Sequence, residues 1–167
     1  MDVRTLSEQD AADFQRIFLR ALHEHPEAFA VSVAEQEALP LDTFAEWFSS
    51  PDNRFYGAYA DDVIIGIMAM QRYQRSKMQH RAGIGPMYVA PEMRGQGIGK
   101  NLLERGLDDV RLWQGVVDVV LGVTVGNDAA RGLYLSAGFT PYSIDPRLLK
   151  IDDRYFDVEW MIQQVHR

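Results

Sequence analysis

Cysteine is absent from the 167 residues of this sequence. Its absence excludes disulfide bonds, thiolate metal sites and a cysteine nucleophile together. No apolar run approaches the length of a membrane span, and Met1–Arg4 lacks the basic-then-apolar layout that opens a signal peptide. We therefore expect a cytoplasmic protein that has no membrane partner.

Positive charge is scarce relative to negative charge. Lysine and arginine number 17 against 24 aspartates and glutamates, so the formal net charge at pH 7 is −7. Nucleic-acid binding relies on clustered Lys and Arg that release counterions, and this balance argues against a nucleic-acid partner. Acidity weakly favours a cationic partner such as an amine, although a solvated acidic surface explains most of the charges better.

The rest of the composition, 47% hydrophobic and 25% charged, is typical of a globular chain. A chain of this length can bury a substantial core, and no repeat, linker or low-complexity tract divides it. We expect residues 1–167 to form a single domain.

A glycine-rich turn stands near the middle of the sequence. An apolar, β-compatible run ends at Val89, Pro91 stops it, and a helical pattern of apolar residues opens at Ile98. The turn Arg94–Lys100 has glycine at every second position, which permits tight backbone geometry and the close approach of a ligand. The first amides of the following helix have no internal partner and lie at the positive end of its dipole. We predict a phosphate-bearing ligand at this turn.

The spacing within the turn discriminates among phosphate ligands. A Walker loop requires glycine and Ser or Thr where this sequence has Arg94 and Asn101, and a dinucleotide fingerprint requires glycine at Lys100. The spacing that fits is Arg-x-x-Gly-x-Gly, which closely resembles the coenzyme-A loop of the GNAT superfamily of N-acetyltransferases. A glycine turn that merely links a strand to a helix is the alternative.

A second signature follows the next β-branched run. The stretch Asn127–Phe139 resembles the GNAT pattern Asn-x-x-Ala-x-x-Leu-Tyr-x-x-x-Gly-Phe. Two signatures in this order, about thirty residues apart, are far more specific than either one alone. The resemblance is strong over residues 81–142 and extends to the rest of the chain only in general layout.

Periodicity and turn signals predict the elements of the chain. The resemblance implies an α/β (α+β) fold, with a mixed, mostly antiparallel central sheet of six to seven strands, flanked by about four helices and splayed at the strand before the coenzyme-A loop. We expect a bulge at Gly85–Pro86 to help the splaying. The expected strands are 2–5, 55–60, 63–70, 81–89, 116–125, 147–151 and 155–162. The expected helices begin after Ser7, at Leu41 with Asp42 as its cap, near Ile98 and at Asn127.

The resemblance assigns roles on the donor side. The strand end at residues 87–89 would pair with the pantetheine arm, the glycine turn would hold the pyrophosphate, and Asn127 would bind the pantetheine arm. Tyr134 would be catalytic, giving its proton to the coenzyme-A sulfur; a tyrosine that only packs its helix onto the sheet is the alternative. The residues expected to bind acetyl-CoA are Met87, Tyr88, Val89, Arg94, Gly95, Gln96, Gly97, Ile98, Gly99, Lys100, Asn127 and Arg131.

The acceptor side is less defined. In GNAT-like proteins the region between the first two strands commonly covers the acceptor, which here implicates an acidic, aromatic-bearing segment. An equally good explanation is that the phenylalanine of this segment belongs to the core and that its glutamates are simply solvated. The histidines at 23 and 25 are two residues apart, a spacing that argues against a metal site. The acceptor candidates are Glu24, Glu27, Phe29, Ser32 and Glu35.

One departure from the family concerns the general base. Many members carry a glutamate on the strand before the coenzyme-A loop, whereas residues 79–90 contain no carboxylate here. The base then comes from elsewhere, such as Glu27, Glu35 or His80, or it is not needed because the amine binds partly unprotonated or loses its proton through a water chain.

These features together predict an acetyl-CoA-dependent N-acetyltransferase in which a primary amine attacks directly in a ternary complex. A catalytically silent acyl-CoA-binding regulatory module is the alternative, and the presence of Tyr134 counts against it. The sequence does not identify the acceptor amine, and it leaves a homodimer open.

Overall fold

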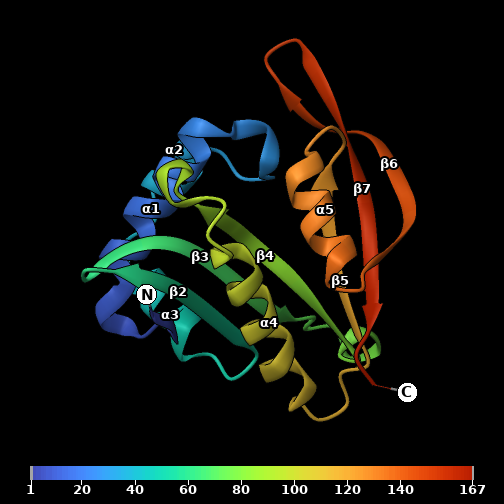
Figure 1. The fold of residues 1–167 in the computed structure, drawn as a ribbon, viewed down its shortest axis with the longest axis horizontal. Coiled ribbons are helices and arrows are strands. Elements are labelled where there is room, and N and C mark those ends of the chain that lie inside the picture. The colour runs from blue at the N-terminus through green and yellow to red at the C-terminus, as the bar shows by residue number, and fades with distance from the viewer. Residues whose placement is uncertain (1, 167) are drawn as a thin grey trace.

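The computed structural model describes residues 2–166, which form one seven-stranded sheet in the order β1-β2-β3-β4-β5-β7-β6 (Figure 1). Every neighbouring pair is antiparallel except β4 and β5, which are parallel. This mixed, mostly antiparallel sheet confirms the predicted fold class. The strands are β1 (Asp2–Thr5), β2 (Asn53–Ala60), β3 (Val63–Arg72), β4 (Arg81–Val89), β5 (Asp118–Thr124), β6 (Thr140–Ile151) and β7 (Arg154–Gln164).

Helices cover both faces of the sheet, because alternate strand residues point to opposite sides. On one face Met68 and Met70 of β3 pack against apolar residues of α4. On the other face Ile67 and Ala69 join an aromatic cluster around Phe14 of α1. The helices are α1 (Ala11–Glu24), α2 (Val33–Glu37), α3 (Leu41–Ser49), α4 (Ile98–Arg111) and α5 (Asp128–Ser136), with short 3-10 turns at Glu8–Asp10, Pro26–Ala28, Ser76–Met78 and Pro91–Met93.

The sheet opens between β4 and β5. The two strands pair over only three residues of each, from Arg81 opposite Asp118 to Gly83 opposite Val120, and then diverge (Figure 1). The expected bulge is present, because the register between β3 and β4 shifts at Gly85–Pro86. Residues 84–89 therefore pair with β3 but present their other edge to an opening, as the predicted splaying requires.

Most predicted elements are confirmed within a few residues, and three details differ. The helix α3 begins at Leu41 with Pro40 as its N-cap, so Asp42 lies in the first turn and the prediction of Asp42 as the cap was wrong. The short helix α2 was not expected. The last two strands are longer than predicted, and Arg167 lies outside the described residues.

Two further observations concern residues 2–166 as a whole. None of the helices found there combines the length and the apolar character that crossing a membrane requires. In the same residues, no three His, Asp or Glu side chains come close enough together to hold a metal ion.

Candidate functional site

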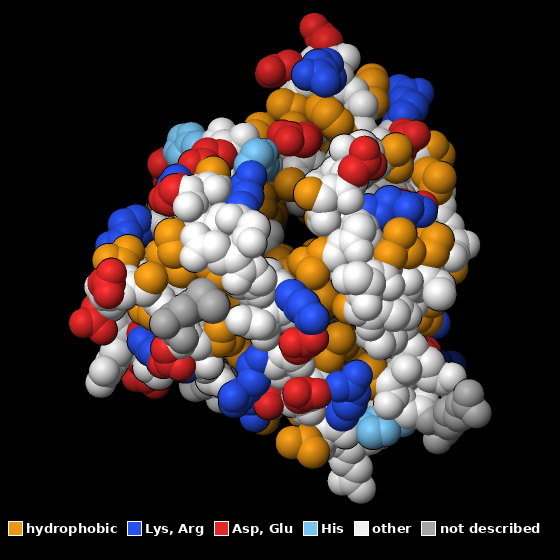
Figure 2. Space-filling model, viewed as in Figure 1, with side chains coloured by type: hydrophobic (Ala, Val, Ile, Leu, Met, Phe, Trp, Pro, Cys, Tyr) orange, Lys and Arg blue, Asp and Glu red, His pale blue; other side chains and the backbone are white. Residues whose placement is uncertain are grey.

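A cavity of about 660 Å³ lies where β4 and β5 separate. The end of β4 and the glycine turn line it on one side, and the end of β5 and the start of α5 line it on the other. Figure 2 shows the surface hollowed between these two halves, with hydrophobic side chains at the floor. The divergence of two parallel strands thus creates the site.

The glycine turn offers backbone amides to this cavity. Gly95 and Gly97 both have φ of 78°, and a Cβ at either position would meet nothing within 4 Å, so the space beside the turn is open. Gly97 is the N-cap of α4. The first hydrogen bond of the helix runs from the Asn101 amide to the Gly97 carbonyl. The amides of residues 98–100 consequently have no helical acceptor and point out of the N-terminus.

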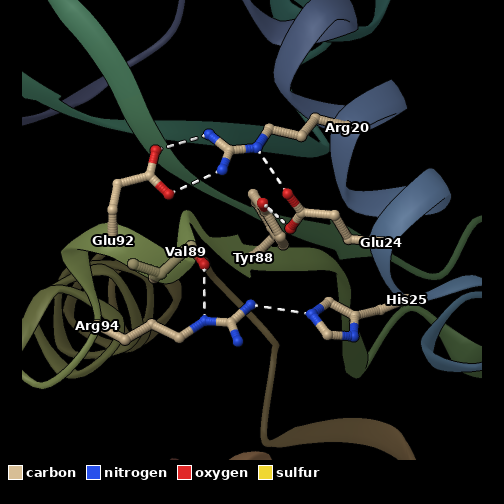
Figure 3. A network of polar contacts seen from close by, with 7 residues as sticks. All are labelled: Arg20, Glu24, His25, Tyr88, Val89, Glu92 and Arg94. Carbon is tan, nitrogen blue, oxygen red and sulfur yellow. Dashed lines mark hydrogen bonds and ion pairs between the residues drawn. The ribbon is translucent and has the colours of Figure 1, made fainter.

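Arg94 is directed back toward β4. Its Nε donates to the Val89 carbonyl at 3.0 Å, and a terminal nitrogen lies 3.1 Å from His25 Nε2 (Figure 3). Its guanidinium also lies over the Tyr88 ring, 5.9 Å from the centroid. The residue lines the cavity and fixes the strand end.

A second set of contacts ties α1 to the same strand end (Figure 3). Arg20 binds both carboxylate oxygens of Glu92 at 2.8 and 2.7 Å, and its Nε donates to Glu24. Glu24 also accepts a hydrogen bond from the Tyr88 hydroxyl. The hydrogen bond from Arg20 lowers the pKa of Glu92 to about 2, while the bonds from Tyr88 and then Arg20 lower the pKa of Glu24. Both carboxylates therefore stay ionised and hold α1 against the turn.

Tyr134 of α5 lies across the opening from β4. Its side chain is only 7% exposed, and its hydroxyl donates to Met87 Sδ at 3.4 Å. Burial raises the pKa of Tyr134 to about 12, so the phenol is protonated at neutral pH and its proton is available. Asn127 is the N-cap of α5, and its side chain accepts a hydrogen bond from the Ala130 amide. Asn127 also lines the cavity.

A second cavity, of about 460 Å³, continues from the first through the opening. The residues common to both linings include Met87 and Tyr134, so the tyrosine lies at the junction of the two cavities. The arrangement allows two ligands to approach one point from opposite faces of the sheet.

A family model described as the acetyltransferase (GNAT) family matches residues 15–139, which is more than half of the chain. The protein belongs to the GNAT acetyltransferases. This membership confirms the family and the enzyme class that the two signatures predicted.

Relatives of this GNAT protein include the N-alpha-acetyltransferase RimI of Mycobacterium tuberculosis, which is 33% identical over 67% of this chain and 68% of its own length. A mycothiol acetyltransferase of Renibacterium salmoninarum is 30% identical over 83% of this chain, which spans only 40% of that relative. Among solved structures, a GNAT acetyltransferase from Streptococcus pneumoniae superposes with a TM-score of 0.86 at 21% identity, covering 99% of each chain. A Salmonella typhimurium protein described with its cofactor acetyl-CoA also gives 0.86, at 22% identity, over 100% of this chain and 95% of its own.

The structure of this acetyltransferase separates the expected donor-side residues into two groups. Most of the strand end and turn, together with Asn127, line the first cavity. Gln96 and Arg131 are not part of that lining, and Arg131 instead binds Glu159 at 2.7 Å.

The expected acceptor-side residues separate in the same way. Glu27 lines the first cavity, and Phe29 lines both. Ser32 and Glu35 form a capping box that starts α2, with the Ser32 amide 2.7 Å from the Glu35 carboxylate. Neither of these two, nor the paired Glu24, lines either cavity.

Of the three residues named as alternative general bases, the structure brings one to the cavity. Glu35 is held in the capping box, and His80 precedes β4 at the end that remains paired with β5. Met87 lies seven positions along the chain from His80, which corresponds to roughly 23 Å of strand at about 3.3 Å per residue. Glu27 is the member of the three whose side chain borders the cavity.

Several lining residues were not anticipated. Thr124 ends β5 and donates to the Glu27 carbonyl at 2.6 Å, which fixes the segment over the opening. Thr124 is a polar residue near the end of the mostly apolar run 116–125, and this is the signal that the sequence displays. Gln36 and Gln71 line the second cavity, and no sequence pattern marks them.

Proposed function

We propose that this protein transfers the acetyl group of acetyl-CoA to a primary amine, which attacks directly while both substrates are bound. The observation that carries the proposal is the junction at Tyr134: one cavity leads to it from the glycine turn, and another leads to it from the opposite face. Such a junction brings a donor and an acceptor together without a covalent enzyme intermediate.

The donor side fits a coenzyme that carries a diphosphate. The free amides at the start of α4 supply hydrogen-bond donors and a positive dipole end, and the space beside Gly95 and Gly97 is open to a phosphate. The edge of residues 84–89 that faces away from β3 has no partner strand, and apart from the Val89 carbonyl, which Arg94 binds, it offers backbone groups to the amides of an extended arm. A cavity of about 660 Å³ is large enough for part of such a molecule.

The chain performs three tasks in the proposed reaction. Acetyl-CoA supplies the acetyl thioester when it is bound. The edge of β4 orients that group at the opening, which converts a bimolecular encounter into a positioned one. Tyr134 then gives its hydroxyl proton to the departing sulfur, a role open to a phenol that is protonated at neutral pH.

Ligand-induced stabilisation tests the donor site. We expect acetyl-CoA to raise the melting temperature at concentrations where ATP and NAD do not, because only the first has the pantetheine arm that the open strand edge fits. Equal stabilisation by ATP or NAD contradicts the assignment.

Thiol release then tests catalysis. With a panel of primary amines, we expect release of free coenzyme A to depend on both substrates. Stabilisation by acetyl-CoA without release for any amine would instead indicate the regulatory acyl-CoA-binding module.

A further inference from the structure

The lining of the second cavity bears on the kind of acceptor that it can bind. Among the described residues, not one charged side chain borders it. Apolar side chains and uncharged polar ones make up the lining, and its aromatic residues come from α1, α3, β2, β7, α5 and the segment before α2. The six aromatic residues besides Tyr134 are Phe14, Phe18, Phe29, Trp47, Phe55 and Trp160.

The carboxylates near the second cavity lie outside its lining and face other side chains of the protein. Glu159 is paired with Arg131 at 2.7 Å, and Glu24 is bound by Arg20 and Tyr88. Glu27 borders the first cavity, and its carboxylate lies 3.7 Å from His25. A cation that entered the second cavity would have no carboxylate of its own to bind.

The continuation of the cavity is unfavourable to cations as well. A third cavity of about 760 Å³ shares Gln71, Ile84 and Trp160 with the second. The charged residues in its described lining are Arg72 and Arg75. A polycationic acceptor would meet aromatic walls first and positive charge beyond them.

These surroundings determine the protonation state of a bound amine. Burial of an unpaired ammonium is costly, and an apolar site lowers the pKa of an amine, so the neutral form is favoured. We propose that the acceptor is a small, weakly basic amine with an aromatic body, bound as the free base. This inference rests on the proposed acetyl transfer and specifies its acceptor.

Gln36 provides an independent observation that points to a ligand. It borders the cavity and is only 6% exposed, and within residues 2–166 its side-chain oxygen has no hydrogen-bond donor. A buried acceptor without a partner is costly, and a ligand N–H removes that cost. Rotation of the amide about its terminal torsion, which is soft, presents the oxygen to the cavity.

A neutral amine also explains the missing base. Its nitrogen lone pair forms the new bond to the acetyl carbon, the carbon–sulfur bond breaks, and its electron pair remains on sulfur. Tyr134 protonates that sulfur, and the proton lost by the nitrogen restores the tyrosine. The products are the acetamide and the free thiol, so no other proton acceptor is required.

Three amides with the same α-amine and different side chains test the body of the acceptor: phenylalaninamide, alaninamide and lysinamide. We expect kcat/KM for thiol release to fall in that order, by roughly tenfold or more between the first and the last. Lysinamide equal to or better than phenylalaninamide overturns the inference and leaves acetyl transfer intact. No transfer to any of the three also overturns it, while stabilisation by acetyl-CoA would still support the donor site.

The pH dependence of kcat/KM tests whether the amine binds as the free base. For a substrate bound neutral, kcat/KM rises until the amine itself is deprotonated. Phenylalaninamide, whose amine is close to an α-amino group with a pKa of about 8, should therefore plateau roughly two pH units below phenethylamine, whose amine is close to that of lysine at about 10. Coincident midpoints would show that an enzyme group removes the proton, which contradicts the inference.

Variants separate the two features of the cavity. Gln71→Glu places a carboxylate in the lining and should lower the preference for phenylalaninamide over lysinamide by about tenfold. Gln9→Glu adds the same charge at an exposed position outside the lining and should leave the preference unchanged. An unchanged preference in Gln71→Glu overturns the inference.

Gln36→Leu distinguishes a substrate contact from a structural one. It should reduce kcat/KM for phenylalaninamide about tenfold while the melting temperature stays equal or rises, since an unpartnered polar group is replaced by an apolar one. Unchanged kcat/KM would remove Gln36 from the acceptor site.

Discussion

At the scale of single residues, Tyr134 combines a buried ring with a weakly bound hydroxyl. The ring packs edge-on against Phe139, with centroids 6.0 Å apart, so removal of the hydroxyl leaves the packing in place. The sulfur of Met87 is a weak acceptor, and the hydroxyl is accordingly free to turn toward a ligand.

We expect Tyr134→Phe to lower kcat by about 10²–10⁴-fold, the usual contribution of a positioned acid. Binding of acetyl-CoA should be nearly unchanged, because the ring and the glycine turn are retained. Calorimetry and thiol-release kinetics on the same samples check both statements. Equal turnover in the variant and the parent would remove Tyr134 as the proton donor.

Gly97 tests the turn. At φ of 78° with open space beside it, glutamate adds backbone strain and puts a negative charge where phosphates are expected. We expect Gly97→Glu to abolish stabilisation by acetyl-CoA.

Gly115→Glu is the matched control for the turn. Gly115 has φ of 81°, also has open space beside it, and lies outside the first cavity. This variant carries the same charge and a similar strain but should still bind acetyl-CoA. Loss of binding in both variants would show that the effect does not depend on the position of the turn, and it would contradict the assignment of the phosphate site.

At the scale of elements, Asp10 lies just before α1 and its carboxylate binds residues of the neighbouring elements. Its carboxylate accepts two bonds from Arg4, at 2.7 and 3.0 Å, one from the Ser7 amide and one from the Tyr59 hydroxyl. The hydrogen bonds from Arg4 hold the pKa of Asp10 well below its ordinary value. This carboxylate joins β1, α1 and β2.

We expect Asp10→Asn to destabilise the fold by about 2 kcal/mol at pH 7, a typical loss for hydrogen bonds to a charged group. Because the folded pKa is lowered, the contribution is complete above the unfolded value of about 4 and is lost as the pH falls through the folded value. The difference between parent and variant in urea unfolding should therefore shrink between about pH 5 and pH 2. Asp13→Asn, in a more exposed pair with Arg16, should cost at most about 0.5 kcal/mol.

The elements around the donor site were predictable because their signals are local. A strand, a glycine turn and a helix start follow one another within residues 81–111, and each has its own residue pattern. The capping box of Ser32 and Glu35 has a local signal of the same kind, because Ser-x-x-Glu is its pattern, and this pattern assigns both residues to the start of a helix.

Other features depend on contacts that the sequence does not display. The strand β6 contains Pro141 and Pro146, which argue against a strand, but it lies at the edge of the sheet, where proline is tolerated. Glu24 reads as a free carboxylate until the fold brings Arg20 and Tyr88 to it. The second cavity likewise draws its lining from segments that lie far apart in the sequence, such as α1, α3, β4 and β7.

At the scale of the whole molecule, the sheet consists of two parts joined narrowly. Strands β1 to β4 form one part and β5, β7 and β6 the other, with three residue pairs between them. The contact of Thr124 with the Glu27 carbonyl bridges the open end. A ligand that pairs with the free edge of β4 would extend one part of the sheet into the opening.

We therefore expect hydrogen exchange to report the donor directly. Peptides covering residues 84–89 should exchange more slowly when acetyl-CoA is added, because free backbone groups gain partners, whereas peptides from β2 should not change. Mass spectrometry of the parent and of Gly97→Glu provides the comparison, and the variant should show no slowing. Stabilisation of the parent by acetyl-CoA without slower exchange at residues 84–89 would show that the arm does not accept hydrogen bonds from the free amides of this edge.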